Sequence, residues 1–305
     1  MSMPTLAPDG VLIVNKHAGV TSHDIVGMVR RLFGTRAVGH AGTLDPMATG
    51  VLVVLLGRAA KATEYLSGGD KRYIATLRLG LTTDTQDTTG TVLTTSDRIP
   101  GEAEVQAALP AFRGEIMQLP PMYSALKVGG QKLVDLARQG VVVERQARPV
   151  TVHALTATPT NCETDYTLDV TCSGGTYIRT LCEDIGASLG CGGAMASLCR
   201  ATACGFTLYE SVTIAELEAM DREARLALLR PTESLFSSLP SLTLPSFYDR
   251  LISSGCAVAL TKLRAVHPLG TRLRLYHPDG RFFALGEVVS GDEGLALRSI
   301  KTFVL

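Results

Sequence analysis

Residues 51–56 (VLVVLL) constrain the fold more than any other stretch of this 305-residue chain. Six consecutive apolar residues bounded by Gly50 and Gly57 are typical of a strand that is buried on both faces. The run is the longest apolar stretch in the sequence, yet it is far too short to cross a lipid bilayer. The sequence therefore predicts a strand at the centre of a large core.

A single carboxylate, that of Asp45, precedes this strand in residues 39–50 (GHAGTLDPMATG). Gly39 and Gly42 lack a Cβ and so permit turns, whereas Pro46 fixes its own φ and pushes Asp45 towards an extended conformation. A loop anchored on a buried strand is a common position for a catalytic group. The turn by itself favours a simpler alternative, in which Asp45 only closes an Asx-turn before Pro46.

The longer string of residues 39–61 (GHAGTLDPMATGVLVVLLGRAAK) resembles the catalytic motif of the TruB-type pseudouridine synthases. The family pattern is roughly G-H-x-G-x-L-D-P-x-A-T-G, and the sequence meets every fixed position of it. Enzymes of this family isomerise a uridine in the T-arm of tRNA. The resemblance implies that Asp45 is the nucleophile of a tRNA pseudouridine-55 synthase, which acts on a base flipped out of the RNA stack. It leaves open whether Asp45 attacks ribose C1′ or uracil C6.

Two further residues of the N-terminal part are expected near the substrate. Lys16 belongs to a stretch that is similar to the family motif D-K-P-x-G-x-T-S, although Asn15 and His17 replace its Asp and Pro. Lys16 is a candidate substrate-binding residue that touches phosphate, and bracing of the catalytic loop is the preferred alternative. His40 is implied to bind RNA, or to fill the space that the flipped base vacates; a histidine hydrogen-bonded inside the loop is the alternative.

Residues 175–180 (GTYIRT) match another family motif without a gap. The resemblance implies that Arg179 is a catalytic partner of Asp45, because a guanidinium holds a carboxylate in a fixed pose and keeps it ionised. It also makes Tyr177 a candidate substrate-binding residue. Without the motif, an arginine on the exposed first turn of a helix is the simpler interpretation.

Tyr73 ends the triplet KRY at the start of an expected strand and matches the K-x-Y motif of the family. The resemblance implies that Tyr73 is catalytic, with its ring on the target base and its hydroxyl near the reacting carbons; an isolated strand tyrosine is more often a packing residue. Leu198 is implied to form the floor of the uracil pocket, or else is a plain core leucine. Departures from the family pattern at residues 199, 201, 204 and 205 leave the contacts of Arg200 undefined.

The pattern of elements predicts an α+β fold in two domains. Residues 1–236 are expected to form the pseudouridine synthase catalytic domain on a mixed sheet, and residues 237–305 a small β-rich, PUA-like RNA-binding domain. The second assignment depends on a hairpin at residues 272–285, and residues 237–246 resemble a linker. Polar residues 82–90 are assigned a structural role as a tight turn. The expected helices are residues 21–34, 58–66, 102–112, 131–139, 177–190 and 213–220.

The net charge is zero, which argues weakly against a nucleic-acid partner. Residues 1–80 carry 9 Lys and Arg against 5 Asp and Glu, and residues 241–305 carry 8 against 5, whereas residues 81–240 carry 12 against 19. The basic ends could hold a polyanion while the acidic middle faces solvent, although ordinary charge scatter explains the same counts.

Seven cysteines form no C-x-x-C pair, and the N-terminal residues lack the basic start and apolar stretch of a signal peptide. We therefore expect reduced thiols in a cytoplasmic protein without a structural metal. The implied isomerisation needs no cofactor. The expected partner is the T-arm of tRNA, bound by a monomer without a membrane or a guide RNA.

Two rival functions are weighed against this one. A dyskerin-type synthase, which works in a guide-RNA particle, is disfavoured by the short chain and by the absence of basic tails. A non-enzymatic tRNA-binding or tRNA-folding protein is disfavoured by the intact set of Asp45, Tyr73 and Arg179.

Overall fold

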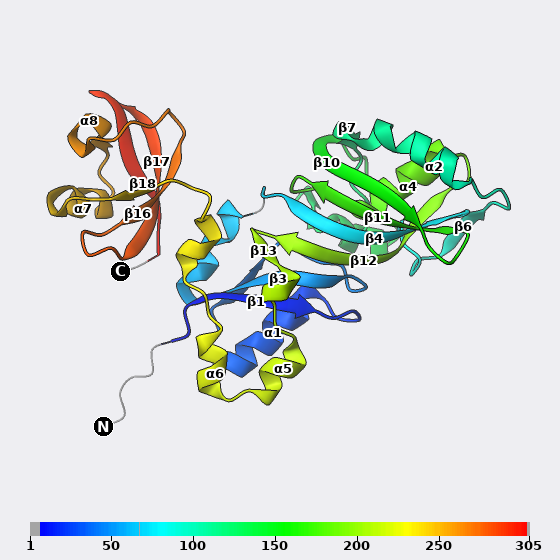
Figure 1. Ribbon diagram of the computed structural model, residues 1–305, viewed down its shortest axis with the longest axis horizontal. Helices are drawn as coiled ribbons and strands as arrows, with labels where there is room; N and C mark the ends of the chain where they lie inside the picture. Colours follow the sequence, from blue (N-terminus) through cyan, green and yellow to red (C-terminus); the bar gives the residue numbers. More distant parts are fainter. Residues whose placement is uncertain (1–6, 67, 304–305) are drawn as a thin grey trace.

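Two main β-sheets of different size organise the described part of the chain, beside the two-stranded sheets β5-β6 and β8-β9 (Figure 1). The structure, a computed structural model, describes residues 7–66 and 68–303. The larger sheet has nine strands in the order β1-β3-β12-β4-β11-β10-β7, with β2 beside β3 and β13 beside β12. The smaller sheet has five strands in the order β14-β16-β17-β18-β15. The expected α+β fold is confirmed, and no helix in the described residues is long and apolar enough to cross a membrane.

The N-terminal half of the large sheet is built around β3, whose residues 50–56 are all buried, as the apolar run predicts. β1 pairs antiparallel with β3, and α1 lies beside β2. The helix α1 begins after Thr21, which forms a capping box with Asp24, and ends at Gly34 in the left-handed conformation. The elements of this half are β1 (Gly10–Lys16), α1 (Ser22–Phe33), β2 (Val38–Ala41), β3 (Thr49–Leu56) and the 3-10 helix η1 (Gly57–Tyr65).

Strand β12 (Gly193–Ala203) joins the two halves of the large sheet and makes the sheet mixed. It pairs in parallel with β3 and antiparallel with β4 (Lys71–Leu79). Arg200 therefore lies opposite Gly50 on one side and opposite Tyr73 on the other. Three motifs that are far apart in the sequence thus meet on adjacent strands.

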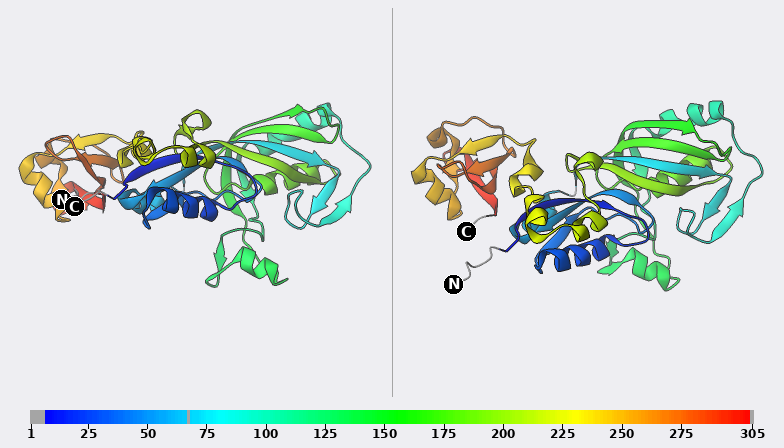
Figure 2. Two further views of the ribbon diagram at one scale, coloured as in Figure 1. Left: turned by 90° about the horizontal axis from the view of Figure 1, so that it is seen from below. Right: turned by 60° about the horizontal axis from the view of Figure 1, so that its bottom comes forward.

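The outer half of the large sheet is antiparallel, and α4 packs its buried residues Leu181 and Ile185 against it. The segment that carries β8, β9 and α3 projects away from the sheet (Figure 2). The remaining elements here are β5 (Leu81–Thr83), β6 (Val92–Thr95), α2 (Glu102–Ala108), η2 (Leu109–Phe112), β7 (Gly114–Gln118), β8 (Lys127–Val128), β9 (Gln131–Lys132), α3 (Leu133–Arg138), β10 (Arg148–Pro159), β11 (Asp165–Cys172) and α4 (Ile178–Ser188).

The predicted C-terminal hairpin is formed by β16 and β17, with Arg274 opposite Leu285. The predicted linker at residues 237–246 is partly wrong, because β14 pairs in parallel with β16 and Leu244 is buried in the core of the small sheet. Apolar residues between the serines and prolines of this stretch fill that core. The elements are β13 (Phe206–Thr207), η3 (Leu208–Glu210), α5 (Ile214–Ala219), α6 (Arg222–Ala227), η4 (Thr232–Phe236), β14 (Ser241–Thr243), α7 (Ser246–Ser253), β15 (Val258–Ala259), α8 (Leu260–Leu263), β16 (Arg272–Tyr276), β17 (Phe282–Gly291) and β18 (Gly294–Thr302).

The two sheets are in contact through an aromatic cluster. The rings of Phe236, Phe282 and Phe303 have centroids 5.5 to 6.5 Å apart. The hydroxyl of Tyr65 also donates to the carbonyl of Ile300 at 3.2 Å. Because Phe236 packs against the second sheet, the domain boundary after residue 236 stays a prediction.

Candidate active site

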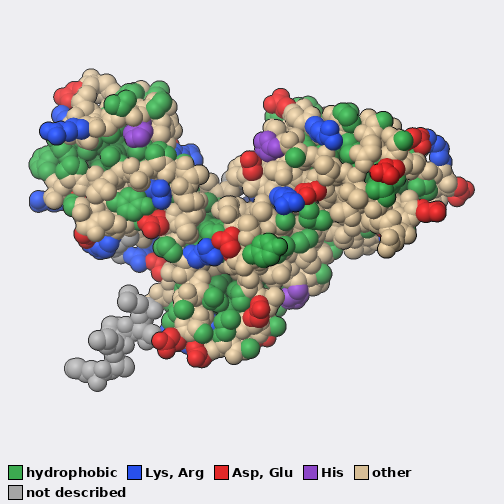
Figure 3. All heavy atoms as spheres, in the orientation of Figure 1, with side chains coloured by type: hydrophobic (Ala, Val, Ile, Leu, Met, Phe, Trp, Pro, Cys, Tyr) green, Lys and Arg blue, Asp and Glu red, His purple; other side chains and the backbone are tan. Residues whose placement is uncertain are grey.

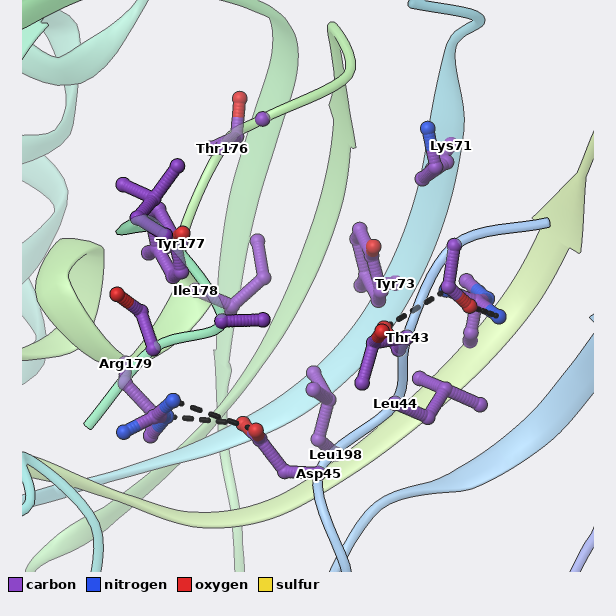
Figure 4. A pocket seen from close by; sticks show the side chains of 16 residues that line it. Thr43, Leu44, Asp45, Lys71, Tyr73, Thr176, Tyr177, Ile178, Arg179 and Leu198 are labelled. Atoms are coloured by element: carbon purple, nitrogen blue, oxygen red, sulfur yellow. Dashed lines mark hydrogen bonds and ion pairs between the residues drawn. The ribbon is translucent and has the colours of Figure 1, made fainter. Parts of the chain in front are cut away.

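A cavity of about 330 Å³ opens where the loop of residues 42–45 meets β4, β12 and the start of α4 (Figure 4). Four separate sequence motifs contribute to its walls. The structure thereby brings most of the predicted site residues into one place. Those that line the cavity are Asp45, Tyr73, Tyr177, Arg179 and Leu198.

Asp45 and Arg179 form a two-point ion pair at one end of this cavity (Figure 4). Nε of Arg179 lies 2.9 Å from Oδ2 of Asp45, and Nη2 donates to Oδ1 at 3.3 Å. The Arg179 side chain is 6% exposed, whereas that of Asp45 is 35% exposed. The paired N–H groups fix the orientation of the carboxylate while the cavity gives a ligand access to it.

Backbone groups from two other loops hold Arg179 from behind. Its Nη1 donates to the carbonyl of Thr85 at 3.0 Å, and its Nη2 donates to the carbonyl of Tyr123 at 2.8 Å. The buried carboxylate of Asp87 lies 4.0 Å from Nε. The turn at residues 82–90 therefore positions a candidate catalytic residue, a role that the sequence reasoning missed. The only sequence feature that could have pointed to this role is the run of hydroxyl and carboxylate side chains in residues 82–90, which has no cation beside it in the sequence.

Lys16 lies beneath the catalytic loop with its side chain fully buried, and it is not among the residues that line the cavity. Its Nζ donates to the carbonyls of His17 at 3.0 Å, Pro46 at 3.2 Å and Ala48 at 2.6 Å. Burial lowers the pKa of Lys16 to about 8, and the nearby charge of Asp45 partly opposes that shift. The geometry supports the bracing role for Lys16 instead of the predicted contact with substrate.

Arg200 braces the opposite side of the same loop and is also almost fully buried. Its Nε donates to the carbonyl of Val51 at 2.8 Å, and its Nη2 donates to the carbonyl of Gly42 at 3.0 Å. Gly50 has a φ of 103°, and a Cβ there would lie 2.3 Å from the carbonyl oxygen of Arg200. Only glycine allows β3 and β12 to approach so closely at this point. The contacts that the sequence left undefined are therefore those of a loop brace.

The walls of the cavity are largely apolar and aromatic. Tyr73 on β4 and Leu198 on β12 lie on neighbouring strands, with Ile178 and Tyr177 at the start of α4 facing them (Figure 4). Burial raises the pKa of Tyr73 and that of Tyr177, so both hydroxyls keep their protons at neutral pH. A flat pyrimidine fits between such surfaces.

His40 lies on β2 opposite Val54 and does not line the cavity. Its Nδ1 is buried and finds no hydrogen-bond partner within the described part of the chain. Burial also lowers the pKa of His40, which keeps the ring neutral at pH 7. His40 as a whole is half-buried, and its contact with RNA stays a prediction.

Across residues 7–66 and 68–303, no group of three or more His, Cys, Asp or Glu side chains is arranged to hold a metal ion. The ionisable groups of the cavity wall are the carboxylate of Asp45, the guanidinium groups of Arg179 and Arg200, the ammonium of Lys71 and the protonated phenols of Tyr73 and Tyr177.

Two models of known protein families match adjoining parts of the chain. A model described as the TruB family pseudouridylate synthase (N terminal domain) matches residues 30–178. A second model, the tRNA pseudouridylate synthase B C-terminal domain, matches residues 179–237. The two matches together include the loop of Asp45, the strand of Tyr73 and the helix of Arg179.

Relatives and solved structures extend the similarity to most of the chain. Proteins named tRNA pseudouridine synthase B from Aromatoleum aromaticum and Burkholderia mallei are each 42% identical to it, over 92% and 95% of this chain and 88% and 96% of their own. A chain of a Cbf5-Nop10-Gar1 complex shares the fold, with a TM-score of 0.75 at 24% identity over 98% of this chain and 86% of that chain. A chain of an H/ACA RNP bound to a substrate RNA containing 2'-deoxyuridine gives a TM-score of 0.73 at 21% identity, over 98% and 86% of the two chains. The identity to the named relatives, maintained over more than nine-tenths of the sequence, means that this chain belongs to the TruB family of pseudouridylate synthases.

Proposed function

We propose that this protein is a tRNA pseudouridine synthase that isomerises a uridine of the T-loop, at position 55, with Asp45 as the nucleophile. The observation that carries the proposal is the Asp45 carboxylate, which is held at two points by Arg179 and is open to a cavity of about 330 Å³ that has aromatic and apolar walls. The relatives named tRNA pseudouridine synthase B support the substrate class.

The reaction balances without an oxidant, a reductant or a metal. The bond between N1 of uracil and C1′ of ribose breaks, the base turns, and a bond forms between C5 and C1′ while C5 loses a proton and N1 gains one. Asp45 suits this sequence because a carboxylate can attack, hold a covalent intermediate and later leave. Tyr73, whose hydroxyl stays protonated and lies in the same cavity, is the group we assign to the proton of C5 through transfer with solvent.

The uridine must leave the RNA stack to reach the carboxylate. We assign Tyr73 and Leu198 to the two sides of the flipped base, and Tyr177 to its edge. We assign His40 to a contact with the RNA near the vacated position. A single-stranded loop gives up a base more easily than a duplex, which favours the T-loop of tRNA as the target. We expect one chain to act alone in the cytoplasm, without a guide RNA.

The replacement Asp45→Asn tests the nucleophile. Asparagine has nearly the same size but no negative charge, so the variant should fold, bind a T-arm stem-loop and form no pseudouridine. The measurement is single-turnover release of tritium from C5-labelled uridine, alongside filter binding. Asp97→Asn is the matched control, because Asp97 is exposed on the surface, away from the cavity. Tritium release by Asp45→Asn at the parent rate would exclude Asp45 as the nucleophile.

The same assay separates the rival functions. A guide-RNA-dependent synthase leaves an isolated T-arm unmodified until a guide is added. A tRNA-binding or folding protein binds the T-arm and releases no tritium in the parent form. Product formation by the parent chain alone contradicts both alternatives.

A further inference from the structure

Lys71, the first residue of β4, carries a buried ammonium whose hydrogen bonds are incomplete. The residue is 8% exposed, and its Nζ donates to the carbonyl of Gly69 at 2.7 Å. A lysine ammonium has three donors, of which one is used here. Within the described ranges, 7–66 and 68–303, no carboxylate lies within 4.0 Å of this Nζ. The charge is therefore buried without the partner that a buried charge normally has.

The surroundings of Lys71 make this burial more unfavourable. A Cβ on Gly42 would lie 3.6 Å from Cε of Lys71 and 3.4 Å from Nη1 of Arg200, so two cations flank the same residue of the catalytic loop. Burial and the charge of Arg200 both lower the pKa of Lys71. Among the nearby acids, Asp70 is exposed and pairs with His153 at 3.1 Å. A buried cation beside another cation attracts an anion from outside the chain.

A second cavity, of about 470 Å³, lies at the junction of the two sheets, and Lys71 belongs to its wall as well as to the wall of the active-site cavity. Figure 4 places the Lys71 nitrogen at the far end of the active-site cavity, directed away from Asp45. Its acceptor Gly69 lines the junction cavity. Figure 3 shows that the surface is hollowed between the two sheets. Lys71 therefore separates two adjoining spaces, one of which ends at the candidate nucleophile.

The junction cavity combines cationic and apolar walls. Arg272 is its second cation; its Nε lies 3.4 Å from Oε2 of Glu287, and its guanidinium lies 5.5 Å from the centre of the Tyr65 ring. Phe236, Leu239 and Leu285 supply apolar surface. Cations beside aromatic and apolar surface match a nucleotide, which joins a phosphate to a flat base.

We propose that Lys71 binds a phosphate of the RNA strand next to the flipped uridine, and that the junction cavity receives the nucleotide attached to that phosphate. The inference rests on the proposed function, because it takes the uridine in the active-site cavity as its starting point. The two cavities share Lys71 as a common wall, and adjoining nucleotides share one phosphate. This nucleotide subsite extends the contact surface from the large sheet to Arg272 on the small sheet.

A stability measurement distinguishes this role from a structural one. Lys71→Met keeps the length of the side chain and removes a buried charge that has no ionic partner among the described residues of the free protein. We expect the melting temperature of the variant to equal or exceed that of the parent, while its affinity for RNA falls. A purely structural lysine would lose stability instead.

The binding experiment uses a T-arm stem-loop and a set of the same RNA in which one phosphate at a time is replaced by a neutral methylphosphonate. The parent should bind more weakly to the RNA in which the methylphosphonate replaces one particular phosphate beside the reactive uridine. Lys71→Met should bind the unmodified RNA about tenfold more weakly and show no further loss at that position. The slope of log affinity against log salt should also fall by about 0.7–0.9.

Two further variants complete the test. Arg72→Met is the matched control, because Arg72 is the next residue of β4, is exposed, and already pairs with Asp169 at 2.6 Å. It should keep the parent's sensitivity to the same methylphosphonate. Lys71→Arg preserves the charge and should keep that sensitivity too, which covers the case in which Lys71→Met folds poorly.

The proposal is overturned if Lys71→Met binds with the parent's affinity and salt slope, or stays sensitive at the same phosphate. It is also overturned if Lys71→Arg folds but loses the sensitivity. Pseudouridine formation by the parent is measured separately. If the parent forms pseudouridine but Lys71→Met keeps its sensitivity to the methylphosphonate, only the nucleotide subsite is rejected. If Lys71→Met loses that sensitivity but the parent forms no pseudouridine, only the proposed function is rejected.

Discussion

All three nitrogens of the Arg179 guanidinium have partners. Nε and Nη2 contact the carboxylate of Asp45, and the two Nη atoms donate to the carbonyls of Thr85 and Tyr123. A planar fork of this kind resists rotation, because turning it breaks several charge-assisted hydrogen bonds at once. At the scale of single residues, the orientation of the candidate nucleophile depends on this fork and not on charge alone.

Arg179→Lys should therefore fold but turn over slowly. Lysine keeps the charge and loses the two-point contact with Asp45, and a hydrogen bond to a charged group contributes about 1.5–3 kcal/mol. We expect turnover on saturating RNA to fall at least about tenfold with little change in affinity. Arg78→Lys is the control, because Arg78 forms the same two-point contact with Asp165, at 2.9 and 2.7 Å, outside the cavity. Equal rates in the two variants would contradict the prediction.

The hydroxyl of Tyr73 is the second group that a single substitution tests. Burial raises its pKa, so the phenol is protonated near neutral pH, and it can take the C5 proton only if its own proton passes to another acceptor in the same step. Tyr73→Phe keeps the ring and removes the hydroxyl, so RNA should bind as before while single-turnover product formation falls about a hundredfold. Tyr166→Phe, a buried tyrosine of β11 outside the cavity, should leave the rate unchanged. A parent-like rate in Tyr73→Phe would reduce Tyr73 to a stacking residue.

At the scale of elements, the catalytic loop is held between two buried cations that bind its carbonyl oxygens. Lys16 extends from β1 to the carbonyls of Pro46 and Ala48, and Arg200 extends from β12 to those of Gly42 and Val51. Every residue has a backbone carbonyl, whatever its side chain. This arrangement therefore tolerates sequence changes in the loop as long as the backbone conformation is kept. The brace makes loop geometry depend on two strands instead of on the loop's own residues.

Because the pKa of Lys16 is lowered in the folded protein, the contribution of Lys16 to the free energy of unfolding should depend on pH. The pKa is about 8 in the native state against 10.5 for an ordinary lysine, so between these pH values the unfolded chain holds the proton and the native state releases it. Stability contributed by this group therefore rises with pH across that window, and the burial penalty is complete below it. The difference in unfolding free energy, parent minus Lys16→Met, should rise by at most about 1.4 kcal/mol per pH unit in urea titrations. A difference that is flat or falls from pH 8 to 10 would contradict this.

At the scale of the whole molecule, the second sheet packs against the first, so it cannot be removed without exposing buried residues. Phe282 and Phe303 pack on Phe236, so ending the chain near residue 241 would uncover that ring and confuse weaker binding with weaker folding. The contribution of the small sheet to RNA binding is better tested by surface charge. Residues 241–305 have three more basic than acidic side chains.

Replacing Arg250, Arg264 and Arg298 by glutamine should weaken binding of whole tRNA and leave turnover on saturating tRNA within about twofold. All three are exposed, and none has an ion pair in the described part of the chain. For each of these arginines that binds a phosphate, its replacement should lower the salt slope by about 0.7–0.9. Lys262→Gln and Arg281→Gln are controls, since these cations already pair with Glu293 and Asp279 and should matter less. A normal affinity together with abolished turnover would contradict a binding role for this domain.

Local sequence patterns were enough to predict those elements whose signals lie within a few residues of one another. Strand β3 follows from its apolar run, and α1 follows from Thr21, Asp24 and Gly34, because a cap and a helical period are encoded within a few residues. The hairpin of β16 and β17 was predicted for the same reason. Motif resemblance then named the residues that line the cavity, without their geometry.

Only the tertiary structure decided which side chains hold the catalytic loop. The partners of Lys16, Arg200 and Arg179 are largely backbone carbonyls, which every residue possesses, so no sequence pattern can identify them. The same holds for β14, whose place depends on the groove beside β16. Likewise, only the folded chain shows that Lys71 lies between two cavities and that no carboxylate of residues 7–66 and 68–303 pairs with its ammonium. Local sequence determines what a segment can form, whereas burial of charge is settled by segments that meet from distant parts of the chain.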